Sequence, residues 1–156
     1  MTELDESATG TAEYDITPLL QPFQVRGLQL RNRFVMPGMQ RYWCADGAPD
    51  QRLREYYRRR VRGGAALVIS ESCAIDHPSA TKNPTFARIS PDTRDAWRVC
   101  VAGVHEAGGA MFLQLWHQGA VNYGGDAESN PAFVALSPSG LSHPGESFGR
   151  AATEAA

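Results

Sequence analysis

Long apolar runs, closely spaced cysteines and a large excess of one charge are all missing from this chain of 156 residues. Its apolar stretches are only a few residues long, whereas a membrane-spanning helix needs about 20. Cys44, Cys73 and Cys100 form no Cys-x-x-Cys pair, so neither a zinc site nor a disulfide framework is indicated. The net charge of −2 argues against nucleic-acid binding through charge alone. We therefore expect no metal, no membrane partner and no nucleic-acid partner.

The composition is that of one globular domain. Hydrophobic residues make up 42% of the chain and charged residues 21%, which is enough apolar material for one core. Residues 1–16 contain several acidic side chains and no Lys or Arg, so they are predicted to form a disordered acidic tail and not a secretory signal. The ordered part is expected over residues 17–156 and in the cytoplasm, where the three thiols would stay reduced.

Alternating apolar runs and amphipathic stretches predict an α/β fold. We expect a hairpin over residues 19–30, strands over 33–36, 65–70 and 110–115, helices over 50–62 and about 90–107, a long irregular loop ending near residue 89, and little regular structure after residue 122. The later strands read as continuous apolar runs, which is typical of a parallel sheet buried on both faces. No Gly-x-Gly-x-x-Gly sequence follows the first strand, which counts against a doubly wound dinucleotide-binding domain.

Both predicted helices have a start signal and an apolar face. Asp50 is the candidate cap of the first helix, and Ser90-Pro91-Asp92 is the predicted start of the second. The inward face of the first helix is predicted to carry Leu53, Tyr56, Tyr57 and Val61, and that of the second Trp97, Cys100, Val101 and Val104. Six arginines on the first helix are interpreted as a solvated outer face, with a nucleic-acid-binding helix as the alternative.

Several segments, taken in order, resemble one known family. Residues 30–39, Leu-Arg-Asn-Arg-Phe-Val-Met-Pro-Gly-Met, resemble the first barrel strand of the old yellow enzymes, which are FMN-dependent ene-reductases and include bacterial 2,4-dienoyl-CoA reductases. The resemblance is sharpest at Phe-Leu-Gln-Leu-Trp-His-Gln-Gly, residues 112–119. Further similar segments are 55–60, 64–71, 104–109 and 136–141. Each segment alone is moderately specific, but their common order and spacing over roughly residues 19–155 are highly specific.

The resemblance implies a TIM barrel, which needs eight strand–helix units and about 250 residues. This chain supplies three strands and two helices by the reading above. The expected fold class is therefore α/β, a TIM-barrel-like but incomplete structure in which residues 17–156 form the N-terminal part of a (β/α)8 flavin-binding barrel. Barrel enzymes bind ligands at the C-terminal ends of the strands, so the candidate site is expected there.

The resemblance also implies a set of site residues at those strand ends. The candidate cofactor-binding residues are Pro37, Gly38, Met39, Gln40, Ser72 and Gln114, and the candidate substrate-binding residue is Trp116. Gln114 is the strongest of them, because an amide in a strand expected to be buried must find a partner. The plainer alternatives are a Pro-Gly turn for residues 37–38, a strand-end serine for Ser72 and a core aromatic for Trp116. Glu71 and His117 are expected to be structural.

Three positions depart from the family pattern. Gln40 replaces the usual Thr or Cys, Gly38 replaces the usual Pro, and Ala120 stands where relatives have Arg. The family's substrate-holding His-His or His-Asn pair, its proton-donating Tyr and its phosphate loops all come from later strands. No catalytic residue is therefore assigned in this chain.

The implied chemistry is hydride transfer from NAD(P)H through FMN to an activated C=C bond of a small molecule. Three hypotheses remain open at this stage. The chain is part of an FMN ene-reductase, or a stand-alone barrel piece that self-associates and binds flavin weakly, or a non-catalytic interaction module or remnant. Three strands out of eight leave two open sheet edges, and exposed edges promote association, so the first hypothesis is favoured and the isolated chain is not expected to be a well-behaved monomer.

Overall fold

The computed structural model describes residues 14–119, 135–139, 141–143, 146–147 and 150–151. Its helices are α1 (Thr17–Leu20), α2 (Gln51–Arg62) and α3 (Arg94–Glu106). Its strands are β1 (Phe23–Val25), β2 (Leu28–Leu30), β3 (Val35–Met36), β4 (Cys44–Ala45), β5 (Ala48–Pro49), β6 (Leu67–Ala74), β7 (Ala87–Arg88), β8 (Ala110–Trp116), β9 (Leu136–Ser137), β10 (Leu141–His143), β11 (Glu146–Ser147) and β12 (Arg150–Ala151). The α/β class is confirmed, and the described residues form an open structure with no closed barrel.

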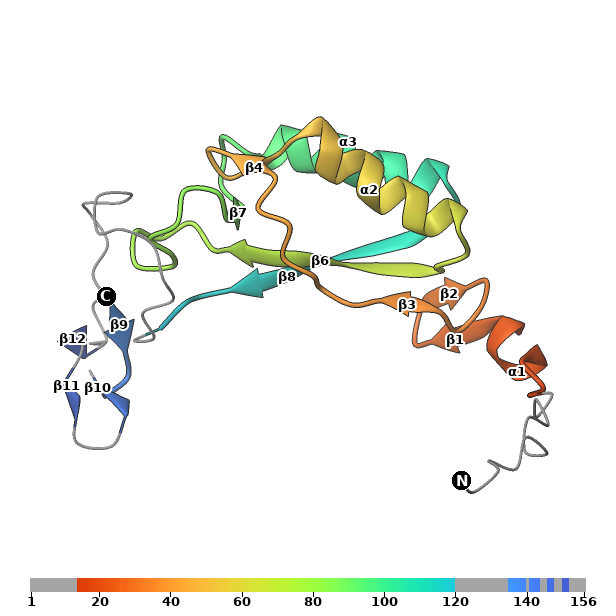
Figure 1. The fold of residues 1–156 in the computed structure, drawn as a ribbon, viewed down its shortest axis with the longest axis horizontal. Coiled ribbons are helices and arrows are strands. Elements are labelled where there is room, and N and C mark those ends of the chain that lie inside the picture. Colours follow the sequence, from red (N-terminus) through yellow and green to blue (C-terminus); the bar gives the residue numbers. More distant parts are fainter. Residues whose placement is uncertain (1–13, 120–134, 140, 144–145, 148–149, 152–156) are drawn as a thin grey trace, which may run out of the picture.

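The centre of the structure is a four-stranded sheet in which β6 pairs with β3, β7 and β8. All three pairings are parallel, as the continuous apolar runs predict. The register of β6 and β8 shifts between Ile69 and Ser72, which then lies opposite Gln114. The strands point toward the same end of the molecule, and the β1–β2 hairpin lies at the other end (Figure 1).

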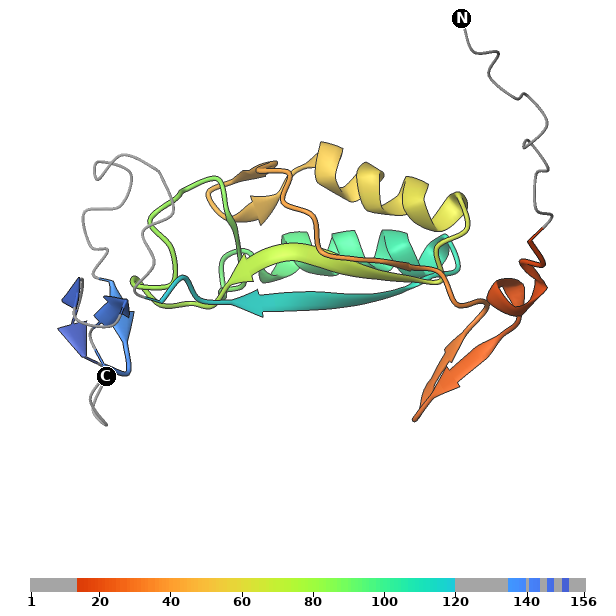
Figure 2. The same ribbon diagram turned by 60° about the horizontal axis from the view of Figure 1, so that its bottom comes forward.

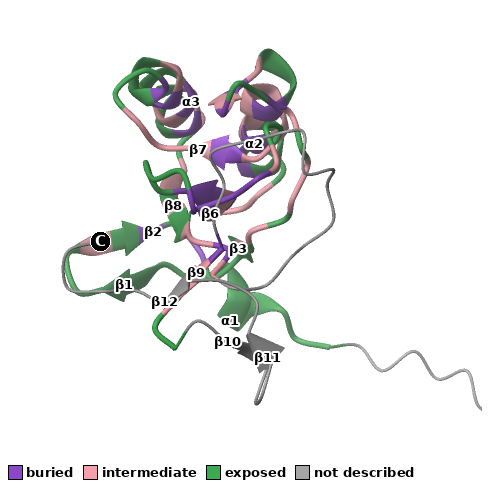
Figure 3. Cartoon of the chain, turned by 90° about the vertical axis from the view of Figure 1, so that its left-hand side faces the viewer, coloured by how far each residue is buried: buried purple, intermediate pink, exposed green. Residues whose placement is uncertain are grey.

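Helices α2 and α3 lie side by side on one face of this sheet, and no helix of the described residues covers the other face (Figures 1 and 2). The predicted Asp50 cap of α2 is confirmed, because its carboxylate accepts a hydrogen bond of 3.0 Å from the Leu53 amide. The core between helices and sheet contains Leu53, Tyr57, Val61, Val68, Cys73, Trp97, Cys100 and Val104. Burial is accordingly concentrated between the helices and β6 (Figure 3). Tyr56, predicted to face inward, is only half-buried.

The start of α3 lies later than predicted. Ser90-Pro91-Asp92 forms a turn, and the helix begins at Arg94 after Thr93. The Thr93 hydroxyl is already engaged, since it donates to the Arg88 carbonyl at 2.7 Å and does not cap the helix. The Trp97 indole donates to the same carbonyl at 2.9 Å. These two bonds attach the first turn of α3 to β7. Ser90 still caps the turn before the helix, because its hydroxyl accepts from the Thr93 amide at 3.4 Å and its carbonyl accepts from the Arg94 amide at 3.1 Å.

The prediction that 110–115 is a strand is confirmed, but the prediction that it is buried is wrong. Phe112 is 53% exposed and Leu115 is 63% exposed. The strand pairs with β6 on one side, and within the described residues no strand pairs with its other side. Met111 and Leu113 pack on the helix-side core, and Ala110 packs on the smaller cluster of Leu30, Ala66 and Leu67.

Several local predictions also need correction. Leu19 and Leu20 belong to α1 and not to the hairpin, and the hairpin turn is made by Arg26 in the left-handed region at φ 49°. The expected loop before α2 contains the β4–β5 hairpin, and the expected loop before Ile89 contains β7. Strand β6 runs four residues further than predicted, to Ala74, because its pairing with β8 continues there. The region after residue 122 includes the short strands β9 to β12.

The first motif of the family resemblance has a clear local role. The Asn32 side chain donates to the Gly64 carbonyl at 2.8 Å and accepts from the Phe34 amide at 3.0 Å. The Arg31 guanidinium donates to the Val61 carbonyl and to the Ala65 carbonyl. These bonds satisfy carbonyls at the C-terminal end of α2 and tie the entry of β3 to the entry of β6.

Some predictions fall outside the described residues. These are most of the acidic tail, which is described only from residue 14, and the departure at Ala120. Cys44, Cys73 and Cys100 are all buried and unpaired. Among the described helices, none has the length and apolar character that crossing a membrane requires.

Candidate functional site

Three residues from three different strand ends meet at one rim of the sheet. The Ser72 hydroxyl on β6 donates to Gln114 Oε1 on β8 at 3.0 Å. The Gln114 backbone amide donates to the Ser70 hydroxyl at 3.0 Å, and Ser70 in turn donates to the Glu71 carbonyl at 2.7 Å. Gly38, just after β3, completes this rim. Together these groups place an amide, a hydroxyl and a bare backbone segment beside one another.

Gly38 passes unusually close to its neighbours. A Cβ added there would lie 2.6 Å from the Ser70 carbonyl oxygen and 3.1 Å from Gln114 Oε1. The first distance is shorter than real Cβ contacts, and it is to backbone, which cannot move aside cheaply. The replacement of the family's usual Pro by Gly is therefore matched by a close approach that only glycine fits.

The surroundings of Gln114 differ from the prediction. Gln114 is exposed, so its amide can bond to water and does not need a partner within the protein. Pro37 and Met39, on either side of Gly38, are also exposed, with Met39 at 47%. The rim therefore offers an amide, backbone and one apolar side chain to the open side of the sheet.

Gln40 is turned toward the helix side. Its Nε2 donates to Glu71 Oε1 at 3.3 Å, and the Arg41 amide donates to Glu71 Oε2 at 2.8 Å. Glu71 is 0% exposed, and this burial raises the pKa of its carboxyl, opposed by the hydrogen bonds from Arg41 and Cys44. The expectation that Glu71 is structural is consistent with these contacts. The structure does not bring the Gln40 amide nitrogen to the rim.

Trp116 belongs to an aromatic cluster at the far end of β8. Its ring stacks on Phe86 with centroids 5.0 Å apart, and Phe86 meets Tyr42 edge-on at 5.4 Å. Trp116 lies two positions after Gln114 and so on the same side of the strand. Sequence reasoning missed Phe86 and Tyr42, because both lie in segments without periodicity. Only the aromatic character of these residues within polar loops could have pointed to them.

His117 is held by a short hydrogen-bonded chain. Its Nδ1 accepts from the Gly119 amide at 2.9 Å, so in the neutral ring the proton lies on Nε2, which is 2.8 Å from the Ser79 hydroxyl. Ser79 is also 2.7 Å from His77 Nδ1. Burial, and then the nearby His77, lower the pKa of His117. Both ring nitrogens are engaged, which agrees with the expectation of a structural histidine.

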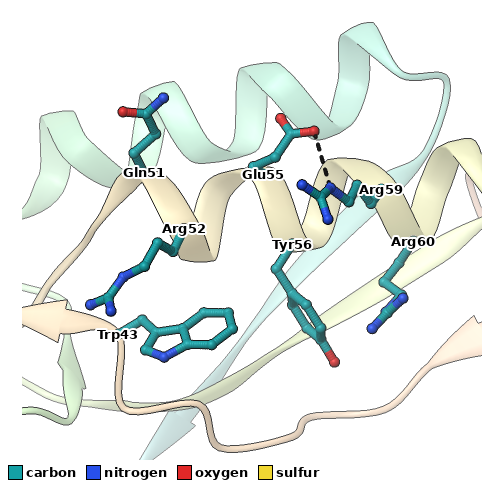
Figure 4. Close-up of a pocket in the computed structure, with 7 residues that line it drawn as sticks. All are labelled: Trp43, Gln51, Arg52, Glu55, Tyr56, Arg59 and Arg60. Atoms are coloured by element: carbon teal, nitrogen blue, oxygen red, sulfur yellow. Dashed lines mark ion pairs between the residues drawn. The ribbon is translucent and has the colours of Figure 1, made fainter.

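A well-formed hollow among the described residues lies away from this rim. It is a groove of about 450 Å³ beside α2, lined by Trp43, Gln51, Arg52, Glu55, Tyr56, Arg59 and Arg60 (Figure 4). Trp43 and Tyr56 meet edge-on at 5.9 Å, and the Arg60 guanidinium lies 4.4 Å from the Tyr56 ring centroid. We refer to it as the α2 groove. None of the candidate site residues named above lines it.

The NADH:flavin oxidoreductase / NADH oxidase family matches this chain over residues 18–155. The chain therefore belongs to that family.

Individual relatives agree with this assignment. The chain is 35% identical over 106 residues to a 12-oxophytodienoate reductase-like protein of Solanum lycopersicum, a match covering 67% of this chain and 29% of the relative. It is 36% identical over 98 residues to an NADH oxidase of Thermoanaerobacter brockii, covering 62% of this chain and 15% of the relative. The chain thus spans less than a third of the length of either relative.

Solved structures give the same result for the fold. The old yellow enzyme homologue of Zymomonas mobilis superposes with a TM-score of 0.70 at 27% identity, covering 88% of this chain and 40% of that enzyme. Morphinone reductase in complex with tetrahydroNAD superposes with a TM-score of 0.66 at 30% identity, covering 77% of this chain and 32% of that enzyme. These neighbours are TIM-barrel old yellow enzymes, whereas the described residues here form an open α/β sheet.

Proposed function

We propose that the rim formed by Gly38, Ser72 and Gln114 is one wall of an FMN site in an ene-reductase, and that residues 17–156 are the N-terminal part of a (β/α)8 barrel. The observation that carries this proposal is the convergence of three parallel strand ends on one exposed amide. Family membership and the barrel fold of the structural neighbours support it.

The residues at the rim fit one edge of a flavin. An amide both donates and accepts hydrogen bonds, so Gln114 can pair with the alternating C=O and N–H groups of a flavin pyrimidine ring. Ser72 orients this amide by donating to its oxygen at 3.0 Å. The segment with exposed Pro37 and Met39 and half-buried Gly38 would provide the flat contact that an aromatic ring system needs. Gln40 would contribute through its main chain, because Glu71 engages its side-chain nitrogen.

The chemistry that bound FMN supplies in this family is hydride transfer from NAD(P)H to the β-carbon of an activated alkene. Trp116, supported by Phe86, would line the substrate side of the ring system. The name of one relative, a 12-oxophytodienoate reductase-like protein, is consistent with a small activated alkene as substrate. The groups that would hold the substrate carbonyl and donate the proton are assigned to later barrel strands of the family, after the three barrel strands that β3, β6 and β8 represent.

A second candidate function is that of a barrel piece that acts only with a partner, either a complementing chain or a second copy. Two observations favour it. Within the described residues, β3 and β8 each have one side without a paired strand. The α2 groove lies between α2 and Trp43, the residue before β4, and is lined by aromatic and arginine side chains that a neighbouring helix could cover (Figure 4). Strands paired with β3 and β8 would extend the sheet, and a helix in the α2 groove would cover the exposed side of α2.

A titration of the purified chain with FMN and with riboflavin tests the first proposal. The protein should quench the fluorescence of FMN and of riboflavin in a saturable way, because the proposed wall contacts the ring system and not the phosphate. Repeating the titration over a range of protein concentrations tests the second candidate, since a site completed by a second copy binds more tightly as the chain associates. Fluorescence that stays unquenched at all concentrations contradicts both.

A further inference from the structure

We propose that Glu71 is a positioning residue for the flavin wall: its buried carboxylate fixes the course of residues 40–44 and thereby the backbone of residues 37–39. The inference rests on the proposed function for its link to FMN. Its structural part, that one carboxylate orders this segment, stands on the geometry alone.

The segment between β3 and β4 has little regular structure of its own. Residues 37–43 lie in neither a helix nor a strand, yet they carry the proposed flavin-facing backbone. Tyr42 adopts φ 60°, in the left-handed region that favours glycine. A residue persists in such a conformation only when its surroundings hold it there. A group outside residues 37–43 must therefore hold this segment in its conformation.

Glu71 provides that support from β6. Three donors from the segment and from the start of β4 converge on its carboxylate: the Arg41 amide at 2.8 Å, Gln40 Nε2 at 3.3 Å and the Cys44 thiol at 3.5 Å. The carboxylate is 0% exposed, so water does not compete for these bonds. A buried carboxylate accepts several hydrogen bonds at once, whereas an apolar side chain accepts none.

Two consecutive residues of β6 thus make hydrogen bonds on opposite faces of the sheet. Glu71 holds the segment on the helix side, while Ser72 orients Gln114 on the rim side. The Glu71 backbone amide donates to the buried Tyr57 hydroxyl of α2 at 2.9 Å, which fixes the strand at this position. Because Gly38 lies against Ser70 and Gln114, a shift of the 40–44 segment would be transmitted to the rim.

The substitution Glu71→Gln tests this inference, with Glu106→Gln on the exposed end of α3 as matched control. The introduced amide can still accept from the Arg41 amide, but its NH₂ group takes the place of the oxygen that accepts from both Gln40 Nε2 and the Cys44 thiol. We expect hydrogen exchange over residues 37–44 and tryptic cleavage after Arg41 to increase about tenfold in Glu71→Gln. Cleavage after the exposed Arg62 should stay within twofold in the same protein.

A paired substitution supplies the rescue. Glu71→Gln combined with Gln40→Glu restores an amide–carboxylate pair in reversed order, and exchange over residues 37–44 should return to within threefold of wild type. If Glu71→Gln does not fold, Gln40→Ala, which removes one donor and keeps the carboxylate, should raise exchange in the same segment. Unchanged exchange and cleavage in whichever of these single variants folds would overturn the inference.

FMN binding by the same variants tests the link between Glu71 and the cofactor. FMN should bind Glu71→Gln about tenfold more weakly than wild type, and any bound flavin should show altered absorption bands, while Glu106→Gln should match wild type. A wild-type chain that binds no FMN, together with the expected exchange result, would refute the proposed function and leave Glu71 as the residue that orders the segment. Normal FMN affinity and normal bands in Glu71→Gln would refute the positioning role at the flavin wall.

Discussion

The Ser72 hydroxyl donates a hydrogen bond of 3.0 Å to Gln114 Oε1, across the register at which these two residues lie opposite each other on β6 and β8. This bond fixes the direction of an exposed amide at the end of two parallel strands. Gly38 lies close enough to the same amide that no other residue fits there without movement. Any ligand recognised at this rim would therefore meet a pre-oriented amide.

Gly38→Ala should destabilise the chain by about 1–3 kcal/mol, because the added methyl group lies 2.6 Å from a backbone carbonyl oxygen. Gly27→Ala is the matched control, since a Cβ at that turn position meets nothing within 4 Å. Its effect should stay within about 0.5 kcal/mol. Denaturant unfolding of both variants measures the difference. Equal stability of the two variants would show that the close approach at Gly38 is relaxed in solution.

His117 should make the chain less stable as the pH falls. Its pKa is lowered in the folded state, so between that lowered value and the ordinary value near 6.5 the unfolded chain binds more protons. Stability contributed by the neutral ring is present above pH 6.5 and is lost on acidification, because protonated Nδ1 would face the Gly119 amide. His117→Asn should reduce the loss of stability between pH 7.5 and pH 5.5.

The matched control for this experiment is His105→Asn, at an exposed position in the last turn of α3. Glu71 acts in the opposite direction, because its raised pKa makes ionisation costly and lowers stability as the pH rises. Unfolding measured at several pH values therefore separates the two groups. An identical pH dependence in wild type and His117→Asn would contradict the assigned role of His117.

The three cysteines should be unreactive in the folded chain. Burial raises the pKa of Cys73 and of Cys100 to about 12 and raises the pKa of Cys44 as well. At pH 8 a thiol with a pKa of 12 is a thiolate in only about one molecule in ten thousand. A thiol reagent should therefore label no cysteine in native conditions and three in denaturant. Rapid native labelling would show that the core between α2, α3 and the sheet opens readily.

Strand β8 should drive self-association of the isolated chain. Phe112 is 53% exposed beside the rim, on a strand with one side unpaired in the described part of the chain. Phe112→Glu should shift the chain toward monomer in sedimentation experiments, because a charge there opposes burial against another copy. Val99→Glu, at a position 57% exposed on α3, is the control and should leave association unchanged. A wild-type chain that is monomeric at high concentration would contradict this prediction.

The sequence predicted the parts of this fold that depend on periodicity and on local capping. Helix α2 begins after Asp50 as its side chain requires, and β3, β6 and β8 are parallel as their apolar runs indicate. The start of α3 lies at Arg94 and not at Ser90, because residues 91–93 form a turn in which the Thr93 hydroxyl donates to the Arg88 carbonyl and does not cap the helix. The exposure of Phe112 could not be predicted from local sequence either, because it depends on which other segments are present to cover β8.

In the candidate site, too, the residues within motifs were predicted and the contacts between distant segments were not. The family motifs selected Gly38, Ser72 and Gln114, and the structure brings these three together. Gln40 was selected with them, but the nearby Glu71 carboxylate turns its side chain away from the rim. The aromatic partner of Trp116, Phe86, lies 30 residues earlier in an irregular loop, so sequence spacing gave no reason to connect them.

The most direct test of the account is the visible difference spectrum of FMN with wild-type chain, with Gln114→Ala and with Gln24→Ala, an exposed hairpin amide that serves as control. Wild type and Gln24→Ala should give the same saturable, perturbed flavin bands. Gln114→Ala should weaken binding by about tenfold, equivalent to about 1.4 kcal/mol. Bands that stay those of free FMN with the wild-type chain, or equal affinity in all three proteins, would contradict the claim that this rim is a flavin wall.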